Sequence, residues 1–182
     1  GEKLGDVVGI PLASTVGVLA FTPPVAATLR SHLHADDLDV RTIHRHVFAD
    51  VYSWAGEYRI TELRRGDSGF AWQADIEGEM QAVTDRAHSL VSQRPADEPA
   101  LAYELSRLYA DYNHVHPFRE GNGRTGSQWL HTISALCGYR LDLSGVSRAD
   151  WYAASRDSMP FRRDGRANHR PFLPLLGRAV GH

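Results

Sequence analysis

Apolar side chains recur at helical spacing along most of the segment between residues 75 and 136. A recurrence every three to four residues marks one face of an α-helix, and it restricts the fold of this chain more than any other feature. We expect three helices here, over residues 75–94, 98–115 and 124–136, with Gly138 ending the last. Their inward faces would carry Ile76, Met80, Val83, Ala87 and Leu90, then Leu101, Leu105, Leu108 and Tyr109, then Trp129, Leu130, Ile133 and Leu136.

Shorter helical patterns lie on either side of these three. We expect helices over 22–34, from Asp36 to Asp50 with Leu38, Ile43, Val47 and Val51 inward, over 147–158 and over 171–180. Residues 1–21 are rich in Gly and Pro without a steady period, which indicates an irregular N-terminal arm. A chain of 182 residues, 42% of them hydrophobic, has enough apolar surface for one core, so we expect residues 22–182 to form a single domain.

One segment has the character of a β-hairpin. Residues 58–63 are β-prone, residues 65–69 have turn chemistry, and residues 70–72 are β-prone again. We find no other convincing strand pair in the sequence. The expected fold class is therefore mainly α, a helical bundle that carries one β-hairpin over about residues 57–72.

Composition argues against several classes of function. The formal net charge is −2, so no general basic field is present to hold nucleic acid. The most apolar stretch, residues 7–21, is short and interrupted, so we expect no membrane span. The single cysteine, Cys137, has no internal disulfide partner and lies in an apolar stretch. A buried thiol in a reducing cytoplasm is the simpler interpretation.

The densest group of polar residues lies between two of the expected helices, at residues 116–124. His116 can exchange a proton near neutral pH, and Glu120 can bind Mg²⁺ together with phosphate oxygens. Residues 121–123, Gly-Asn-Gly, allow close backbone approach and expose amides to an anion. The loop then enters a helix N-terminus, which favours phosphate, and Arg124 adds a phosphate-binding cation. Each element alone is weak evidence, but their clustering indicates nucleophilic attack on a phosphate.

The string His-Pro-Phe-Arg-Glu-Gly-Asn-Gly-Arg at residues 116–124 closely resembles the signature of Fic-domain proteins, His-x-Phe-x-Asp/Glu-Gly-Asn-Gly-Arg-x-x-Arg. Residues 51–59, Val-Tyr-Ser-Trp-Ala-Gly-Glu-Tyr-Arg, resemble the family's segment that leads into a hairpin called the flap. The resemblance covers about residues 38–140, and the turn at residues 65–70 falls where the flap lies.

The resemblance implies transfer of AMP from ATP, the co-substrate, to a Ser, Thr or Tyr hydroxyl of a target protein, with release of pyrophosphate. It implies that His116 is the general base and that Phe118 anchors the loop in the core. The hairpin over residues 59–72 would pair with the target's backbone as an added strand.

The remaining loop residues would hold the nucleotide in such an enzyme. By resemblance, Glu120 would bind Mg²⁺, Gly121, Asn122 and Gly123 would bind the α- and β-phosphates, and Arg124 would neutralise phosphate charge. The Gly-Asn-Gly and the lone Glu also have a plainer interpretation, a turn and a solvated side chain.

The sequence departs from the family signature at Ser127, where the second arginine would fall. In the family that arginine steadies the γ-phosphate of ATP and meets an inhibitory glutamate where one exists. Three alternatives follow: weaker ATP binding, use of another nucleotide or a phosphate or phosphocholine donor, or an impaired protein that works as a non-catalytic binding module through its flap. Arg162, Arg163 or Arg166 would supply the missing charge if their segment folds over the site.

The family's self-inhibiting helix, Ser/Thr-x-x-x-Glu-Gly/Asn, has no counterpart in this sequence. A separate antitoxin-like partner is one way to hold such an enzyme inactive. We expect the protein to act in the cytoplasm, either of the producing cell or of a host cell into which it is delivered as an effector.

Overall fold

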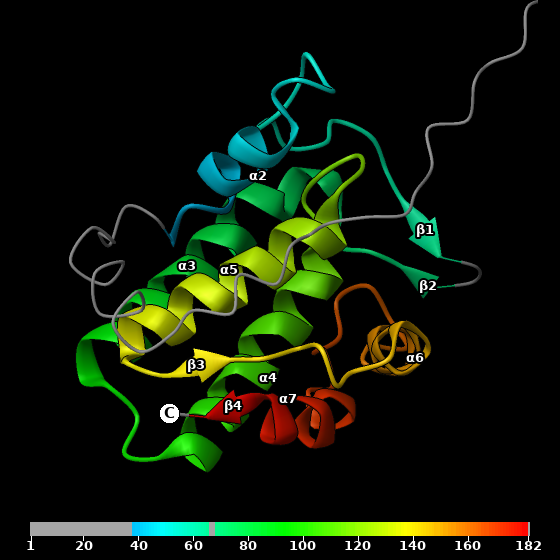
Figure 1. Ribbon diagram of the computed structural model, residues 1–182. Helices are drawn as coiled ribbons and strands as arrows, with labels where there is room; N and C mark the ends of the chain where they lie inside the picture. Colours follow the sequence, from blue (N-terminus) through cyan, green and yellow to red (C-terminus); the bar gives the residue numbers. More distant parts are fainter. Residues whose placement is uncertain (1–37, 66–67, 182) are drawn as a thin grey trace, which may run out of the picture.

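The computed structural model describes residues 38–65 and 68–181, and within them the chain forms a bundle of helices with short strands at its edge (Figure 1). The expected arm over residues 1–21 and the expected helix over 22–34 lie outside these residues. The helices are α2 (Val40–Phe48), α3 (Ile76–Gln93), α4 (Glu98–Val115), α5 (Asn122–Cys137), α6 (Arg148–Asp157) and α7 (Leu173–Ala179). Short 3₁₀ turns, η2 (Gln73–Asp75) and η3 (Arg170–Phe172), precede α3 and α7.

Helix α4 occupies the centre of the bundle. It packs against α3, α5 and α7, and α2 lies across α5 (Figure 1). The inward residues expected on α4, Leu101, Leu105, Leu108 and Tyr109, are all buried. Each fully buried leucine of this kind contributes about 2 kcal/mol of hydrophobic stabilisation. The central position of α4 follows from this wide apolar face.

Two side-chain caps and one glycine set helix ends where the sequence predicts them. The Asp97 carboxylate accepts the N–H of Ala100 at 2.8 Å and begins α4. The Ser147 hydroxyl accepts the N–H of Asp150 at 3.0 Å and begins α6. Helix α5 ends at Gly138, whose φ of +96° is a left-handed conformation suited to glycine. These three boundaries are confirmed.

The face expected for α2 was partly wrong. Ile43 is buried as expected, but Val47 is 38% exposed and Val51 is 66% exposed. The buried stripe instead includes Val40, His44 and Phe48, none of which was among the residues expected inside. The prediction followed apolar identity alone, whereas the helix buries a histidine because its ring nitrogens find partners.

A hairpin is present in the expected segment, but its strands were wrongly placed: residues 58–63 and 70–72 form no strand, and the two short strands lie at the ends of the expected turn. Strand β1 (Arg64–Arg65) pairs antiparallel with β2 (Ser68–Gly69), so that Arg64 lies opposite Gly69. A second small pair, β3 (Arg140–Leu141) with β4 (Val180–Gly181), was not anticipated. Strands of two residues are too short to show alternation of apolar and polar side chains. Because β3 and β4 are also far apart in the sequence, no local pattern could indicate that they pair. Among the described residues no helix is both long and apolar enough to cross a membrane.

Candidate active site

The loop over residues 116–121 connects the end of α4 to the start of α5 and lies between α2 and the hairpin (Figure 1). His116 caps α4 in a left-handed conformation with φ 49° and ψ 61°, and its N–H donates to Tyr112 O at 2.9 Å. A non-glycine residue in this conformation costs about 1 kcal/mol, so neighbouring contacts must hold it. The backbone therefore turns sharply at the residue expected to be the base.

The hairpin supplies one of those contacts. The ring of Phe70, directly after β2, stacks on the His116 imidazole with centroids 3.9 Å apart and planes inclined by 16°. The N–H of Ala71 donates to His114 O at 3.0 Å. The expected base and the end of the flap are thus in direct contact.

Arg59 anchors the other end of the flap and is 1% exposed. Its guanidinium donates to four backbone carbonyls, those of His116 (2.9 Å), Thr61 (2.7 Å), Ala71 (2.7 Å) and Val115 (3.1 Å). Burial lowers the pKa of Arg59, but an arginine retains its charge in proteins. Two of these carbonyls lie at the C-terminus of α4, where a cation is favourable.

His44, on α2, braces the middle of the loop. Its Nδ1 accepts the N–H of Gly56 at 2.9 Å, so Nε2 carries the proton and donates to Glu120 O at 3.1 Å. The ring stacks on Phe118 with centroids 4.0 Å apart. Burial lowers the pKa of His44, which keeps the ring neutral in this tautomer.

The side chain of Asn122 forms hydrogen bonds across the loop. Its side-chain oxygen accepts the N–H of Phe118 at 2.9 Å, and its side-chain nitrogen donates to Phe118 O at 2.8 Å. The Tyr112 hydroxyl donates to Asn122 O at 2.9 Å. Because the amide side chain is committed to Phe118, any phosphate contact by Asn122 would come from its backbone N–H. That group is one of the first amides of α5, which have no acceptor within the helix.

Gly121 is required by its surroundings. Its φ is +84°, and a Cβ at this position would lie 2.5 Å from Cε2 of Phe48. Gly123, by contrast, has open space around it. Glycine at 121 therefore lets α2 approach the loop closely, whereas glycine at 123 leaves the helix N-terminus uncovered.

The charged side chains of the loop are exposed. The Glu120 carboxylate accepts the Gly121 N–H at 3.2 Å, and the Arg124 guanidinium lies 4.3 Å from the centroid of the Phe48 ring. No group of three or more His, Cys, Asp or Glu able to hold a metal occurs among the residues that the structure describes. A single carboxylate next to a helix N-terminus, which favours anions, fits Mg²⁺, because this ion retains waters and takes its other ligands from phosphate.

Ser127 lies one turn after Arg124 on α5 and is half-buried. Of the three arginines considered as a source of the missing charge, Arg163 donates to Glu62 and to Leu63 O, on the flap. It is therefore occupied elsewhere, while Arg162 and Arg166 are exposed.

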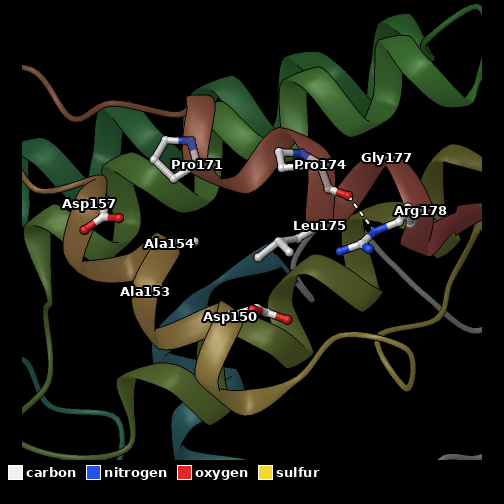
Figure 2. Close-up of a pocket in the computed structure, with 9 residues that line it drawn as sticks. All are labelled: Asp150, Ala153, Ala154, Asp157, Pro171, Pro174, Leu175, Gly177 and Arg178. Carbon is white, nitrogen blue, oxygen red and sulfur yellow. Dashed lines mark hydrogen bonds between the residues drawn. The ribbon is translucent and has the colours of Figure 1, made fainter.

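An open hollow of about 790 Å³ lies between α6 and α7, away from this chemistry (Figure 2). Figure 2 shows Asp150 and Asp157 on α6 and Arg178 on α7 around a small apolar floor that includes Leu175. None of its lining residues belongs to the loop or the hairpin. We therefore assign the candidate site to the loop and not to this hollow.

Sequence reasoning missed two residues of the site, His44 and Arg59. Both are polar types that are usually exposed, and nothing in their local pattern indicates burial. The one indication in the sequence was their position: Arg59 ends the segment over residues 51–59 that resembles the approach to the flap, and His44 lies shortly before it.

The chain is similar to known proteins of one family. A model described as "Fic/DOC family" matches residues 35–134, more than half of the chain. A Sinorhizobium fredii protein named "Probable protein adenylyltransferase y4lH" is 39% identical over 119 residues, which cover 63% of this chain and 62% of that protein. "Protein adenylyltransferase VbhT" of Bartonella schoenbuchensis is 32% identical over 67% of this chain but only 26% of its own length. The chain thus spans less than two thirds of these relatives.

Solved structures show the same fold. The BepC effector of Bartonella tribocorum, with bound AMPPNP, has a TM-score of 0.69 at 20% identity over 85% of this chain and 80% of that one. The N-terminal Fic domain of an effector from Bartonella sp. AR 15-3 has a TM-score of 0.72 at 20% identity over 86% of this chain and 77% of that one.

Proposed function

Because the chain belongs to the Fic/DOC family, we propose that it transfers AMP from ATP to a Ser, Thr or Tyr hydroxyl of a target protein. The observation that carries the proposal is the placement of His116 and the α5 N-terminus at the two ends of one braced loop. A base and an anion-binding helix end are thereby fixed relative to each other. The relatives named as protein adenylyltransferases support the choice of reaction.

In the proposed reaction the target oxygen attacks the α-phosphorus of ATP and its proton passes to His116. The bond from that phosphorus to the oxygen bridging to the β-phosphate breaks, and pyrophosphate leaves. The backbone N–H groups of Asn122 and Gly123, with Arg124, would bind the phosphates. Glu120 would hold Mg²⁺, which supplies charge neutralisation to the phosphates.

We propose that the target docks along the hairpin, whose strands offer a short edge beside His116. A separate antitoxin-like inhibitor is a further proposed partner, since the sequence lacks the family's inhibitory helix. The proposed compartment is a cytoplasm, either the producer's or a host's. The free buried thiol of Cys137, the single cysteine of the sequence, supports it.

The proposal is tested by incubating the protein with a bacterial lysate and ATP labelled at either the α- or the γ-phosphate. We expect label on protein from the α position only. His116→Ala should abolish it, whereas His46→Ala, which changes an exposed histidine on α2, should not. Full labelling by His116→Ala would exclude His116 as the base.

Ser127 favours a second candidate, transfer of a different phosphoryl group. No guanidinium stands at this position of α5 to steady a γ-phosphate. The same assay with α- and γ-labelled ATP, GTP, UTP and CTP distinguishes the two. Label from a γ-phosphate, or from a nucleotide other than ATP, would favour this candidate, and no label from any donor would favour a non-catalytic binding module.

A further inference from the structure

A segment after α6 is fixed to the hairpin by one side chain, that of Arg163. This connector, residues 159–169, lies beside the hairpin in Figure 1. Arg163 Nη1 donates to Glu62 Oε2 at 2.8 Å, and Nη2 donates to Leu63 O at 3.1 Å. The side chain is only 11% exposed, so solvent screens this ion pair less than an ordinary surface pair.

Arg163 also contacts the second arm of the hairpin. Its guanidinium carbon lies 4.1 Å from the centroid of the Trp72 ring. Its aliphatic stem covers Gly69, where an added Cβ would lie 2.7 Å from Arg163 Cδ. The Arg163 side chain therefore contacts both arms of the hairpin: the residues just before β1, and Gly69 and Trp72 on the other arm.

The hairpin needs such support. Its strands have two residues each, and an isolated hairpin is marginal in water even when longer. Arg59 holds the ends of the hairpin from inside, and Arg163 holds its arms from the connector. Phe70 lies between Gly69, which Arg163 covers, and Ala71, whose carbonyl accepts from Arg59. The Phe70 ring stacks on His116.

We propose that Arg163 is a positioning residue that holds the hairpin, and with it Phe70, over His116. The inference rests on the proposed function, since it takes His116 as the base. It also replaces the alternative in which Arg163 supplies the phosphate charge missing at Ser127.

The test uses Arg163→Met, which keeps a stem over Gly69 but removes every donor, and Arg163→Lys, which keeps the charge. Arg156→Met is the matched control, because Arg156 lies on α6 with its side chain 69% exposed. The first measurement is the NMR chemical shift of the His116 ring. The signal is assigned by its loss in His116→Ala. The Phe70→Ala variant gives the shift of the ring without stacking. We expect Arg163→Met to move the signal toward that position, Arg163→Lys to restore part of the shift, and Arg156→Met to change nothing.

Two further measurements separate positioning from phosphate binding. ATP affinity should stay within about twofold of wild type in Arg163→Met, because the side chain contacts the hairpin and not α5. Labelling of lysate proteins from α-labelled ATP should fall about tenfold or more, as expected when a reacting group is misplaced. If wild type labels nothing, the proposed function fails while the NMR measurement still tests the positioning role. An unmoved His116 signal in Arg163→Met would overturn the inference, and so would a large loss of ATP affinity in that variant.

Discussion

Replacing Arg59 by methionine should cost the protein a large part of its stability. Methionine keeps an apolar stem in a site where the native side chain is 1% exposed, but it cannot donate to any of the four carbonyls. Hydrogen bonds from a charged donor are stronger than neutral ones, but removing Arg59 also removes the cost of burying its charge. The net loss is therefore about 1 kcal/mol for each bond. The sum is about 4 kcal/mol, against a total of about 5–15 kcal/mol for a typical domain.

Urea unfolding followed by tryptophan fluorescence measures this loss directly. With a slope of about 2 kcal/mol per molar urea, the midpoint should fall by about 2 M. Arg59→Lys should recover roughly half, since an ammonium has three donors and lacks the planar fork. The control is Arg64→Met, an exposed arginine of the same hairpin, which should stay within about 0.5 kcal/mol of wild type. A loss below about 1 kcal/mol in Arg59→Met would refute the view that this side chain holds the flap to α4.

Three other predictions concern the loop and the core. Gly121→Ala should destabilise the protein by about 1–3 kcal/mol, because the new Cβ meets Phe48 at a positive φ, whereas Gly123→Ala should shift the melting temperature little. His44→Phe keeps a ring in the core but leaves the Gly56 N–H and the Glu120 carbonyl without their partner, so urea titration should show a loss of about 2–4 kcal/mol; wild-type stability would contradict the bracing role. Burial raises the pKa of Cys137 to about 11, so a disulfide reagent at pH 8 should react with it only after unfolding; fast reaction in the native protein would show that the thiol is accessible.

The sequence predicts the helices best where a local cap and an apolar face agree. Helix α4 spans residues 98–115 as expected, because Asp97 caps its start and its leucines share one face. Burial of His44 could not be predicted, since its two hydrogen-bond partners, Gly56 and Glu120, lie 12 and 76 residues away. The same holds for Arg59, whose acceptors belong to both the flap and α4.

The loop motif itself was visible because its chemistry lies within nine consecutive residues. What it did not reveal is how the loop is held. Asn122 offers an amide that suggests a ligand, yet its side chain binds Phe118. Arg163 offers a charge that suggests phosphate, yet it binds the flap. Local sequence indicates which groups are present, whereas the partners of each group depend on packing between distant segments.

The two kinds of contact around the site differ greatly in the length of chain that they close. Asn122 and Phe118 are four residues apart and Tyr112 and Asn122 ten, whereas Arg163 and Glu62 are 101 apart. Short loops cost less entropy to close, so local contacts form early in folding. We infer that α4, the loop and α5 assemble first and that the hairpin docks late, an order that pulsed hydrogen exchange during refolding would reveal. The flap would then also be among the first parts to open, and the native protein would expose His116, the proposed base, through brief local undocking without unfolding the bundle.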